Sequence, residues 1–172
     1  GDNRSGEPIN DMYEIAAYPM VALMNIIGFD ATTLGNHEFD SGQEGLAKLI
    51  DMSAFSALCA NVQPASKWNM HVKPYQIFDC GGLSVGVIGA VALGKLGIPE
   101  SHPDKCVDIK FREPLAAIQE LRWLREKCDV VVLLSHLGYS TDVEFSKELP
   151  WVDIIVGGHS HTQLKSGETH NG

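Results

Sequence analysis

The sequence predicts an α/β protein, built as a layered sandwich of mixed β-sheets flanked by helices. Apolar segments of strand length alternate with segments of helical periodicity, which is typical of α/β proteins. The 172 residues, 44% of them hydrophobic, suffice for one domain with its own core. Neither a repeat nor a linker divides the chain, so we expect a single domain over residues 1–172.

The N-terminal part of the chain predicts two helices followed by alternating strands and helices. Apolar residues recur at three-to-four spacing over residues 9–27, which indicates helix. Pro19 interrupts this helix and suits the first turn of a second one, and Gly28 suits a C-terminal cap. The next predicted elements are, in order, a strand at 29–34, a helix at 45–52 and a strand at 55–62.

The remaining chain begins with a predicted hairpin over residues 75–91. Its two apolar-rich arms flank Gly81 and Gly82, which favour a tight turn. The elements expected after it are a helix at 113–128, a fully buried strand at 129–138 and a short helix at 143–149. A last apolar segment then ends in the sequence GGHSHT.

Composition excludes some classes of function. The formal net charge is −9 at pH 7, so no basic stripe is present to neutralise a nucleic-acid backbone. A small phosphate ligand remains compatible with this charge, because metal ions supply positive charge locally. No apolar run approaches the ~20 residues of a membrane span, and no secretory signal opens the chain.

Cysteine and tryptophan residues are expected to be structural. The cysteines are widely spaced: Cys59, Cys80, Cys106 and Cys128. Without a CxxC pair, a zinc ribbon or thioredoxin-type motif is disfavoured, and we expect buried free thiols rather than disulfides. The tryptophans are expected to be packing residues rather than a base-stacking platform: Trp68, Trp123 and Trp151.

Three segments share one pattern that points to a site. DATTLGNHEFD, DVVVLLSHLG and VDIIVGGHSHT each run from Asp through apolar residues to polar groups. In α/β sheets, the loops at the carboxyl ends of strands gather in one crevice. We therefore expect the crevice to bring together Asn36, His37, His136, His159 and His161.

The residue types in this crevice indicate metal binding. Imidazole, carboxylate and amide groups form the mixed ligand set of zinc, manganese, iron or cobalt. Asn36 is a neutral ligand that leaves such a site positively charged, and Asp2 has two oxygens with which to bridge two ions. Two metals about 3.5–4 Å apart activate a water and hold the oxygens of an in-line displacement. The pattern therefore favours hydrolysis of phosphate esters.

Other polar residues are expected to lie outside the catalytic machinery. Three histidines lack the strand-end context and are expected on the surface: His71, His102 and His170. Arg4 is expected at the solvated surface, with contact to a phosphate as the alternative. Ser135 and Ser160 are interpreted as loop residues and not as nucleophiles.

Four motifs carry a resemblance to a known family. They are GD at residues 1–2, GNHEFD at 35–40, LSHLG at 134–138 and GGHSHT at 157–162. In this order they resemble the calcineurin-like metallophosphoesterases, and more narrowly the 5′-nucleotidase/UDP-sugar hydrolase/2′,3′-cyclic phosphodiesterase branch. The resemblance covers nearly the whole chain. It implies the metallophosphoesterase fold and a metal-dependent phosphoric ester hydrolase acting on nucleotides.

The resemblance also implies roles for individual residues. Asp2 would bridge two divalent metal ions. The other ligands would be Asn36, His136 and His159 at one metal and His161 at the second. His37 would contact the phosphate and stabilise its developing charge, with Asp40 orienting the ring. Glu38 would support the metal ligands through hydrogen bonds.

The chain departs from the family pattern at both ends. The opening Asp-x-His strand of the family has no counterpart before Asp2. The closing strand after GGHSHT and the C-terminal nucleotide-specificity domain are also missing. We therefore interpret residues 1–172 as a catalytic-domain fragment, weak or inactive alone, with one metal site rather than two.

Two alternatives to an enzyme stay open. One is a non-catalytic scaffold that binds metal and phosphate, and the other is a structural zinc domain. For the enzyme, the resemblance implies nucleoside monophosphates, UDP-sugars or cyclic nucleotides as substrates, and a periplasmic or extracellular location.

Overall fold

The predicted hairpin forms one side of the largest sheet. In the computed structural model, which describes residues 1–3 and 8–170, β5 (Tyr75–Cys80) pairs antiparallel with β6 (Leu83–Val91). The turn is Gly81-Gly82, with φ of 68° and 93°. Glycine is required there because both turn residues adopt the left-handed region that side chains disfavour. Arg4 lies outside the described residues.

Two parallel strands extend this hairpin into a four-stranded mixed sheet. The strand β8 (Val130–His136) pairs with β6 along its whole length, and β9 (Ile154–Val156) pairs with β8. The order across the sheet is β5-β6-β8-β9. A parallel central strand is covered on both faces, which explains the nearly continuous apolar run in β8.

Two smaller sheets complete the strand pairing. One is parallel and contains β1 (Ala31–Thr33), β2 (Ser56–Leu58) and β4 (Val72–Lys73). The other pairs β3 (Val62–Gln63) antiparallel with β7 (Lys110–Phe111). The single strand predicted at 55–62 is therefore wrong. The chain turns between β2 and β3, where the buried Asn61 side chain bonds the backbone N–H and C=O of Val91.

Within residues 1–3 and 8–170, the α-helices are α1 (Tyr18–Ile27), α2 (Gly42–Met52), α3 (Pro114–Gln119) and α4 (Tyr139–Glu148). Short 3₁₀ helices lie at Pro8–Asp11 (η1), His37–Ser41 (η2), Ser66–Trp68 (η3), Pro103–Lys105 (η4) and Arg122–Glu126 (η5). The helix predicted before Pro19 is wrong beyond the single turn of η1. Ala17 has φ 68° and donates its N–H to the Asn10 carbonyl at 2.8 Å, a turn that a continuous helix excludes.

The long helix predicted at 113–128 is also wrong, because it is divided into α3 and η5. Ile118, Leu121 and Leu124 are all buried in one cluster beneath the large sheet. In a 3₁₀ helix, side chains three residues apart lie on the same face. After α3 the N–H of Leu121 donates to the Ile118 carbonyl and the N–H of Leu124 to the Leu121 carbonyl, both at 2.9 Å, and all three side chains face the core.

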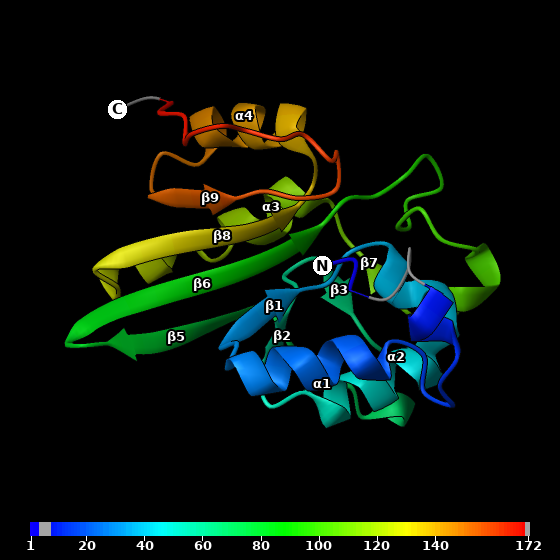
Figure 1. Ribbon diagram of the computed structural model, residues 1–172. Helices are drawn as coiled ribbons and strands as arrows, with labels where there is room; N and C mark the ends of the chain where they lie inside the picture. Colours follow the sequence, from blue (N-terminus) through cyan, green and yellow to red (C-terminus); the bar gives the residue numbers. More distant parts are fainter. Residues whose placement is uncertain (4–7, 171–172) are drawn as a thin grey trace.

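Clusters of buried apolar side chains join the helices to the sheets and to one another. Figure 1 shows α3 and α4 beside the larger sheet and α1 and α2 beside the sheet of β1, β2 and β4. One core cluster joins β6 and β8 to α3, η5 and α4. A second lies between β2, β3, β6 and α2, and a third packs α1 on α2. The predicted layered α/β sandwich of mixed sheets with flanking helices is confirmed.

The cysteine prediction holds for three of the four residues. All four thiols are free, and Cys59, Cys106 and Cys128 are buried, but Cys80 is exposed at the end of β5. Cys80 is the last residue of β5, a strand at the edge of its sheet, and lies next to the exposed Gly81-Gly82 turn. Among the tryptophans, Trp151 is buried in the first core, while Trp123 packs edge-on against Tyr75.

These burials predict the order of thiol modification. Burial raises the pKa of Cys59 to about 12, so its reactive thiolate is scarce at neutral pH. Iodoacetamide at pH 8 should label Cys80 first and Cys59 only after unfolding, as followed by peptide mass spectrometry. Labelling in urea is the control, where all four should react alike. Equal labelling of Cys59 and Cys80 in the folded protein would contradict this packing.

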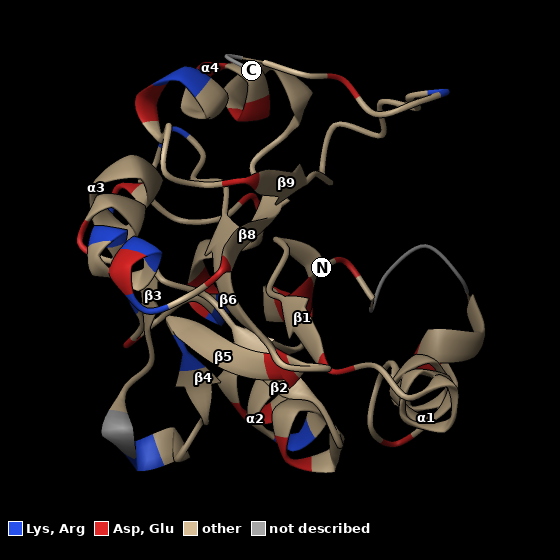
Figure 2. Cartoon of the chain, turned by 90° about the vertical axis from the view of Figure 1, so that its left-hand side faces the viewer, with Lys and Arg blue, Asp and Glu red and all other residues tan. Residues whose placement is uncertain are grey.

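The exposed histidines and the distribution of charged residues agree with the predictions from sequence and composition. His71, His102 and His170 are exposed, as predicted. Figure 2 shows Lys and Arg scattered over several helices with acidic residues between them, rather than gathered along one groove. Within the described residues, no helix is long and apolar enough to cross a membrane.

Candidate metal centre

The site lies where the carboxyl ends of β1, β8 and β9 meet. β8 ends on His136 itself, while His159 follows β9 by three residues. β1 belongs to the other sheet, but the hydroxyl of Thr33 at its end donates to the carbonyl of Ala90 in β6 at 3.3 Å. The predicted crevice therefore forms between the ends of strands from two sheets.

Four of the predicted ligands converge at this point. The Nε2 atom of His136 lies 2.9 Å from Asp2 Oδ2 and 3.2 Å from Asn36 Oδ1. His159 presents its Nδ1 to the same Asn36 oxygen at 3.1 Å. One ligand atom each from Asp2, His136 and His159 lies within 4.8 Å of the other two. This donor set fits one divalent metal ion.

The backbone at these residues is strained. Asp2, His159 and His161 have φ of 61°, 75° and 54°, in the left-handed region that non-glycine residues rarely adopt. Such strain clusters at functional sites, where surrounding contacts hold the chain in place. Here the strained turns present three of the predicted ligands.

Glu38 holds the Asp2 segment against the end of β1. Its buried carboxylate accepts the backbone N–H groups of Asp2 at 2.7 Å, Asn3 at 2.6 Å and Gly35 at 2.5 Å. A Cβ atom on Gly35 would lie 2.2 Å from Asp2 Oδ1, so only glycine permits this approach. Glu38 thus supports a ligand through its backbone and does not bond to a ligand side chain.

Neutralising Glu38 should loosen this segment. Glu38→Gln replaces a charged acceptor of three N–H groups with an amide that accepts at one oxygen only. We expect the free energy of unfolding of the domain to fall by roughly 2 kcal/mol and metal affinity to fall with it. Urea unfolding and metal titration measure the two effects. Glu120→Gln, at an exposed pair with Arg112, is the control and should change neither. Equal stability of both variants would contradict the assigned contacts.

His37 and Asp40 form a pair beside the ligands. The Nδ1 atom of His37 lies 2.7 Å from Asp40 Oδ2, and this hydrogen bond raises the pKa of His37. The backbone N–H of His37 donates to Asp2 Oδ1 at 3.0 Å, while the side chain is 44% exposed. The ring is thus fixed on one side and open to solvent on the other.

The pKa shifts of Asp2 and His159 favour the protonation states that bind a cation. Burial opposes ionisation of Asp2, but hydrogen bonds from His136 and the His37 backbone prevail, and the pKa of Asp2 is lowered. Burial also lowers the pKa of His159, and the nearby His136 adds to this effect. A carboxylate and a neutral imidazole are the protonation states in which these groups bind metal.

His161 is the predicted ligand that the structure does not bring into the cluster. It lies two residues beyond His159 and is exposed. The resemblance assigned it to a different metal from His159, and that role stays a prediction.

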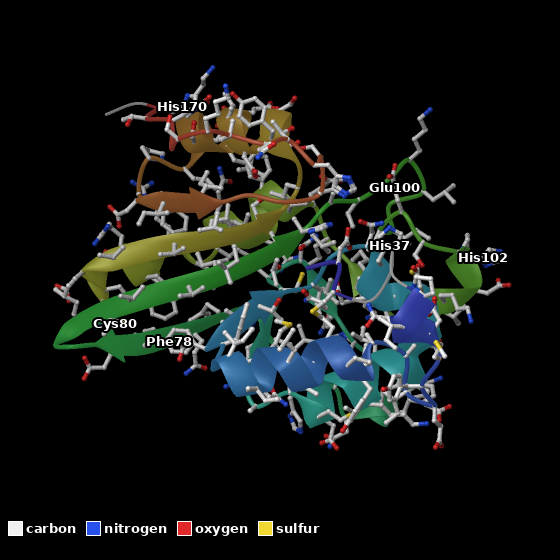
Figure 3. All side chains as sticks on the ribbon, viewed as in Figure 1. His37, Phe78, Cys80, Glu100, His102 and His170 are labelled. Atoms are coloured by element: carbon white, nitrogen blue, oxygen red, sulfur yellow. The ribbon has the colours of Figure 1, made fainter. Side chains whose placement is uncertain are left out.

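Sequence reasoning missed the loop after β6, residues 92–109. The carbonyl of Glu100 accepts the Asn36 amide at 3.1 Å, and the Ser101 hydroxyl donates to Asp40 Oδ1 at 2.9 Å. In Figure 3, Glu100 and His37 lie at the same end of the molecule. The signal was available, since a loop following a parallel neighbour of β8 reaches the same edge.

Imidazole, carboxylate and amide groups that converge in this way form a donor set suited to a divalent metal ion, and a His–Asp pair lies beside them. The family model of calcineurin-like phosphoesterases matches residues 1–163, and the chain belongs to this family. UshA of Yersinia enterocolitica is 36% identical over 188 residues, covering 99% of this chain and 33% of UshA. The NAD 5′-nucleotidase of Haemophilus influenzae is 36% identical over 148 residues, covering 81% and 23%.

A solved structure agrees with these relatives. The 5′-nucleotidase precursor of Thermus thermophilus has a TM-score of 0.79 and 32% identity, covering 90% of this chain and 30% of that one. The predicted branch of the family, which includes UshA and the 5′-nucleotidases, is confirmed. The chain spans about a third of the length of the curated relative UshA.

Proposed function

We propose that the protein containing this chain hydrolyses phosphate esters of nucleotides with the help of divalent metal ions. The observation that carries the proposal is the His37–Asp40 pair, 2.7 Å apart, placed next to the converging Asp2, His136 and His159. A scaffold that only binds metal has no need of such a pair.

Asp2, Asn36, His136 and His159 would hold one metal ion. A bound divalent metal would supply Lewis-acid activation of a water and charge for the phosphoryl oxygens. His161 would contribute to a second ion, together with residues from a longer parent chain. We infer such a parent because residues 1–172 match about a third of UshA, and we assign it a C-terminal substrate-binding domain.

His37 would act directly on the phosphoryl group. Its Nδ1 is held by Asp40, which leaves Nε2 to donate a hydrogen bond to a phosphoryl oxygen. The donor is positioned before the substrate arrives, so little reorganisation is needed as negative charge develops. Asp40 keeps the ring in the tautomer and orientation that this donation requires.

Hydrolysis would proceed without a phosphoserine intermediate. The Ser135 hydroxyl donates to Asp142, and the Ser160 hydroxyl accepts the N–H of Tyr139 at 3.0 Å. Both hydroxyls therefore serve the loops that carry His136 and His159. Trapping of a phosphoserine during turnover would reject this part of the proposal.

The relatives named 5′-nucleotidase and NAD 5′-nucleotidase favour nucleotides as substrates. The resemblance described above implies nucleoside monophosphates, UDP-sugars and cyclic nucleotides as candidates, and we propose the periplasm or cell exterior as location. The full-length protein should be assayed with Mn²⁺ or Zn²⁺ against these esters. Metal-dependent phosphate release that chelation abolishes is the expected result. Binding of metal and phosphate without turnover would favour the scaffold instead.

A further inference from the structure

The loop between β6 and β7, residues 92–109, contacts the residues on both sides of His37. The Asn36 Nδ2 atom donates to the Glu100 carbonyl at 3.1 Å. The Ser101 hydroxyl donates to Asp40 Oδ1 at 2.9 Å. Two consecutive loop residues thus bind a predicted metal ligand and the aspartate that pairs with His37.

Core packing and a turn hydrogen bond hold this loop in place. Ile98, Cys106 and Ile109 pack in the second core cluster, on either side of residues 100 and 101. A turn closes the loop tip, with the Gly94 N–H donating to the Ile98 carbonyl at 2.7 Å. The loop therefore brings the Ser101 hydroxyl to Asp40 from a rigid base, as precise sites require.

The Ser101 hydroxyl is one of the contacts that hold the Asp40 carboxylate. One carboxylate oxygen receives the Ser101 hydroxyl at 2.9 Å and the other faces His37 Nδ1 at 2.7 Å. The terminal torsion of an aspartate is broad, so a carboxylate held on one oxygen only can rotate about it. Bonds on both oxygens remove that freedom and fix the plane in which the imidazole is held.

The Glu100 carbonyl acts in the same way on Asn36. Because it takes the Nδ2 side of the amide, it leaves Oδ1 for His136 and His159, at 3.2 and 3.1 Å. The amide orientation that binds a cation is thereby selected.

We propose that Ser101 is a positioning residue for catalysis, which acts through Asp40 to hold His37 toward the reacting phosphoryl group. The inference rests on the proposed phosphoesterase function. The bond of Ser101 is to Asp40, so its role in the proposal is indirect. Loss of the Ser101 hydroxyl should therefore lower kcat and leave KM unchanged, because the orientation of His37 matters most where charge develops in the transition state.

The test compares serine variants in the full-length protein. Ser101→Ala should lower kcat about tenfold, as expected for a hydrogen bond to a charged group, and leave KM and bound metal unchanged. Ser101→Thr keeps the hydroxyl and should restore most of the activity. Ser84→Ala is the matched control, because Ser84 also donates to an aspartate, Asp129, at 2.8 Å, at the opposite end of β6 and β8. Its kcat should equal that of the wild type.

A double-mutant cycle distinguishes positioning from general damage. In an Asp40→Asn background, Ser101→Ala should lower kcat by less than about twofold, because the residue it serves is already altered. A full tenfold loss in that background, or loss of bound metal in Ser101→Ala, would overturn the proposal. So would an unchanged kcat in Ser101→Ala alone.

Crystal structures of wild type and Ser101→Ala supply a readout independent of activity. We expect one His37 and Asp40 conformation in the wild type, and alternative conformations or a longer Nδ1–Oδ2 distance in the variant. If the wild type hydrolyses no ester but this change is seen, the proposed function fails and the positioning role stands. An unchanged pair in Ser101→Ala would refute the positioning role itself.

Discussion

His37→Ala should lower kcat by roughly 10²–10³-fold in the full-length protein, the usual effect of removing one preorganised donor to a developing oxyanion. Metal affinity should change little, because the His37 ring is bonded to Asp40 and not to the converging ligands. Steady-state kinetics and isothermal titration with Mn²⁺ measure the two quantities separately.

Two further variants serve as comparisons for His37→Ala. Asp40→Asn should weaken catalysis in the same direction without loss of metal, because the ring loses the partner that orients it. His102→Ala removes an exposed histidine from a neighbouring loop and should leave kcat unchanged. If His37→Ala lost metal as severely as a ligand variant, the assigned role of this histidine would be wrong.

His159→Ala should instead act on the metal. Its Nδ1 atom lies 3.1 Å from Asn36 Oδ1, within the converging ligand group. Removing a supporting residue of a metal site typically costs about 10–100-fold in affinity, so loss of a ligand itself should cost at least ~100-fold. Excess metal should then restore part of the activity.

The measurement is a metal titration followed by assays over a range of metal concentrations. His170→Ala is the control, because His170 is an exposed histidine that pairs with Glu168 outside the ligand cluster. Unchanged metal affinity in His159→Ala, or activity that excess metal does not improve, would remove His159 from the predicted ligand set.

The three apolar–polar segments explain why part of the site was predictable. The motifs GNHEFD, LSHLG and GGHSHT are local, and each places its polar residues at or just after the end of a strand. Parallel pairing of β8 and β9 then carries His136 and His159 to one end of the molecule. Periodicity and strand ends depend on short-range chain geometry, which the residues themselves specify.

Helix boundaries were less predictable, because packing overrides local propensity. Periodicity predicts one helix over residues 113–128, but the α-helix ends at Gln119 and a 3₁₀ helix follows, with Leu121 and Leu124 buried in the cluster that contains residues of β6 and β8. The left-handed Ala17 likewise depends on a hydrogen bond to the carbonyl of Asn10.

The sequence alone determined the layered α/β class, the Gly81-Gly82 hairpin and the polar residues that could meet at the strand ends. Tertiary structure decided which of them do meet: Asn36 touches His136 and His159, while His161 stays outside. It also revealed Ser101, which lies 61 residues from Asp40 in the chain. A hydroxyl on a loop carries no periodic signal, and only the folded path of the chain brings it within hydrogen-bond distance of the carboxylate.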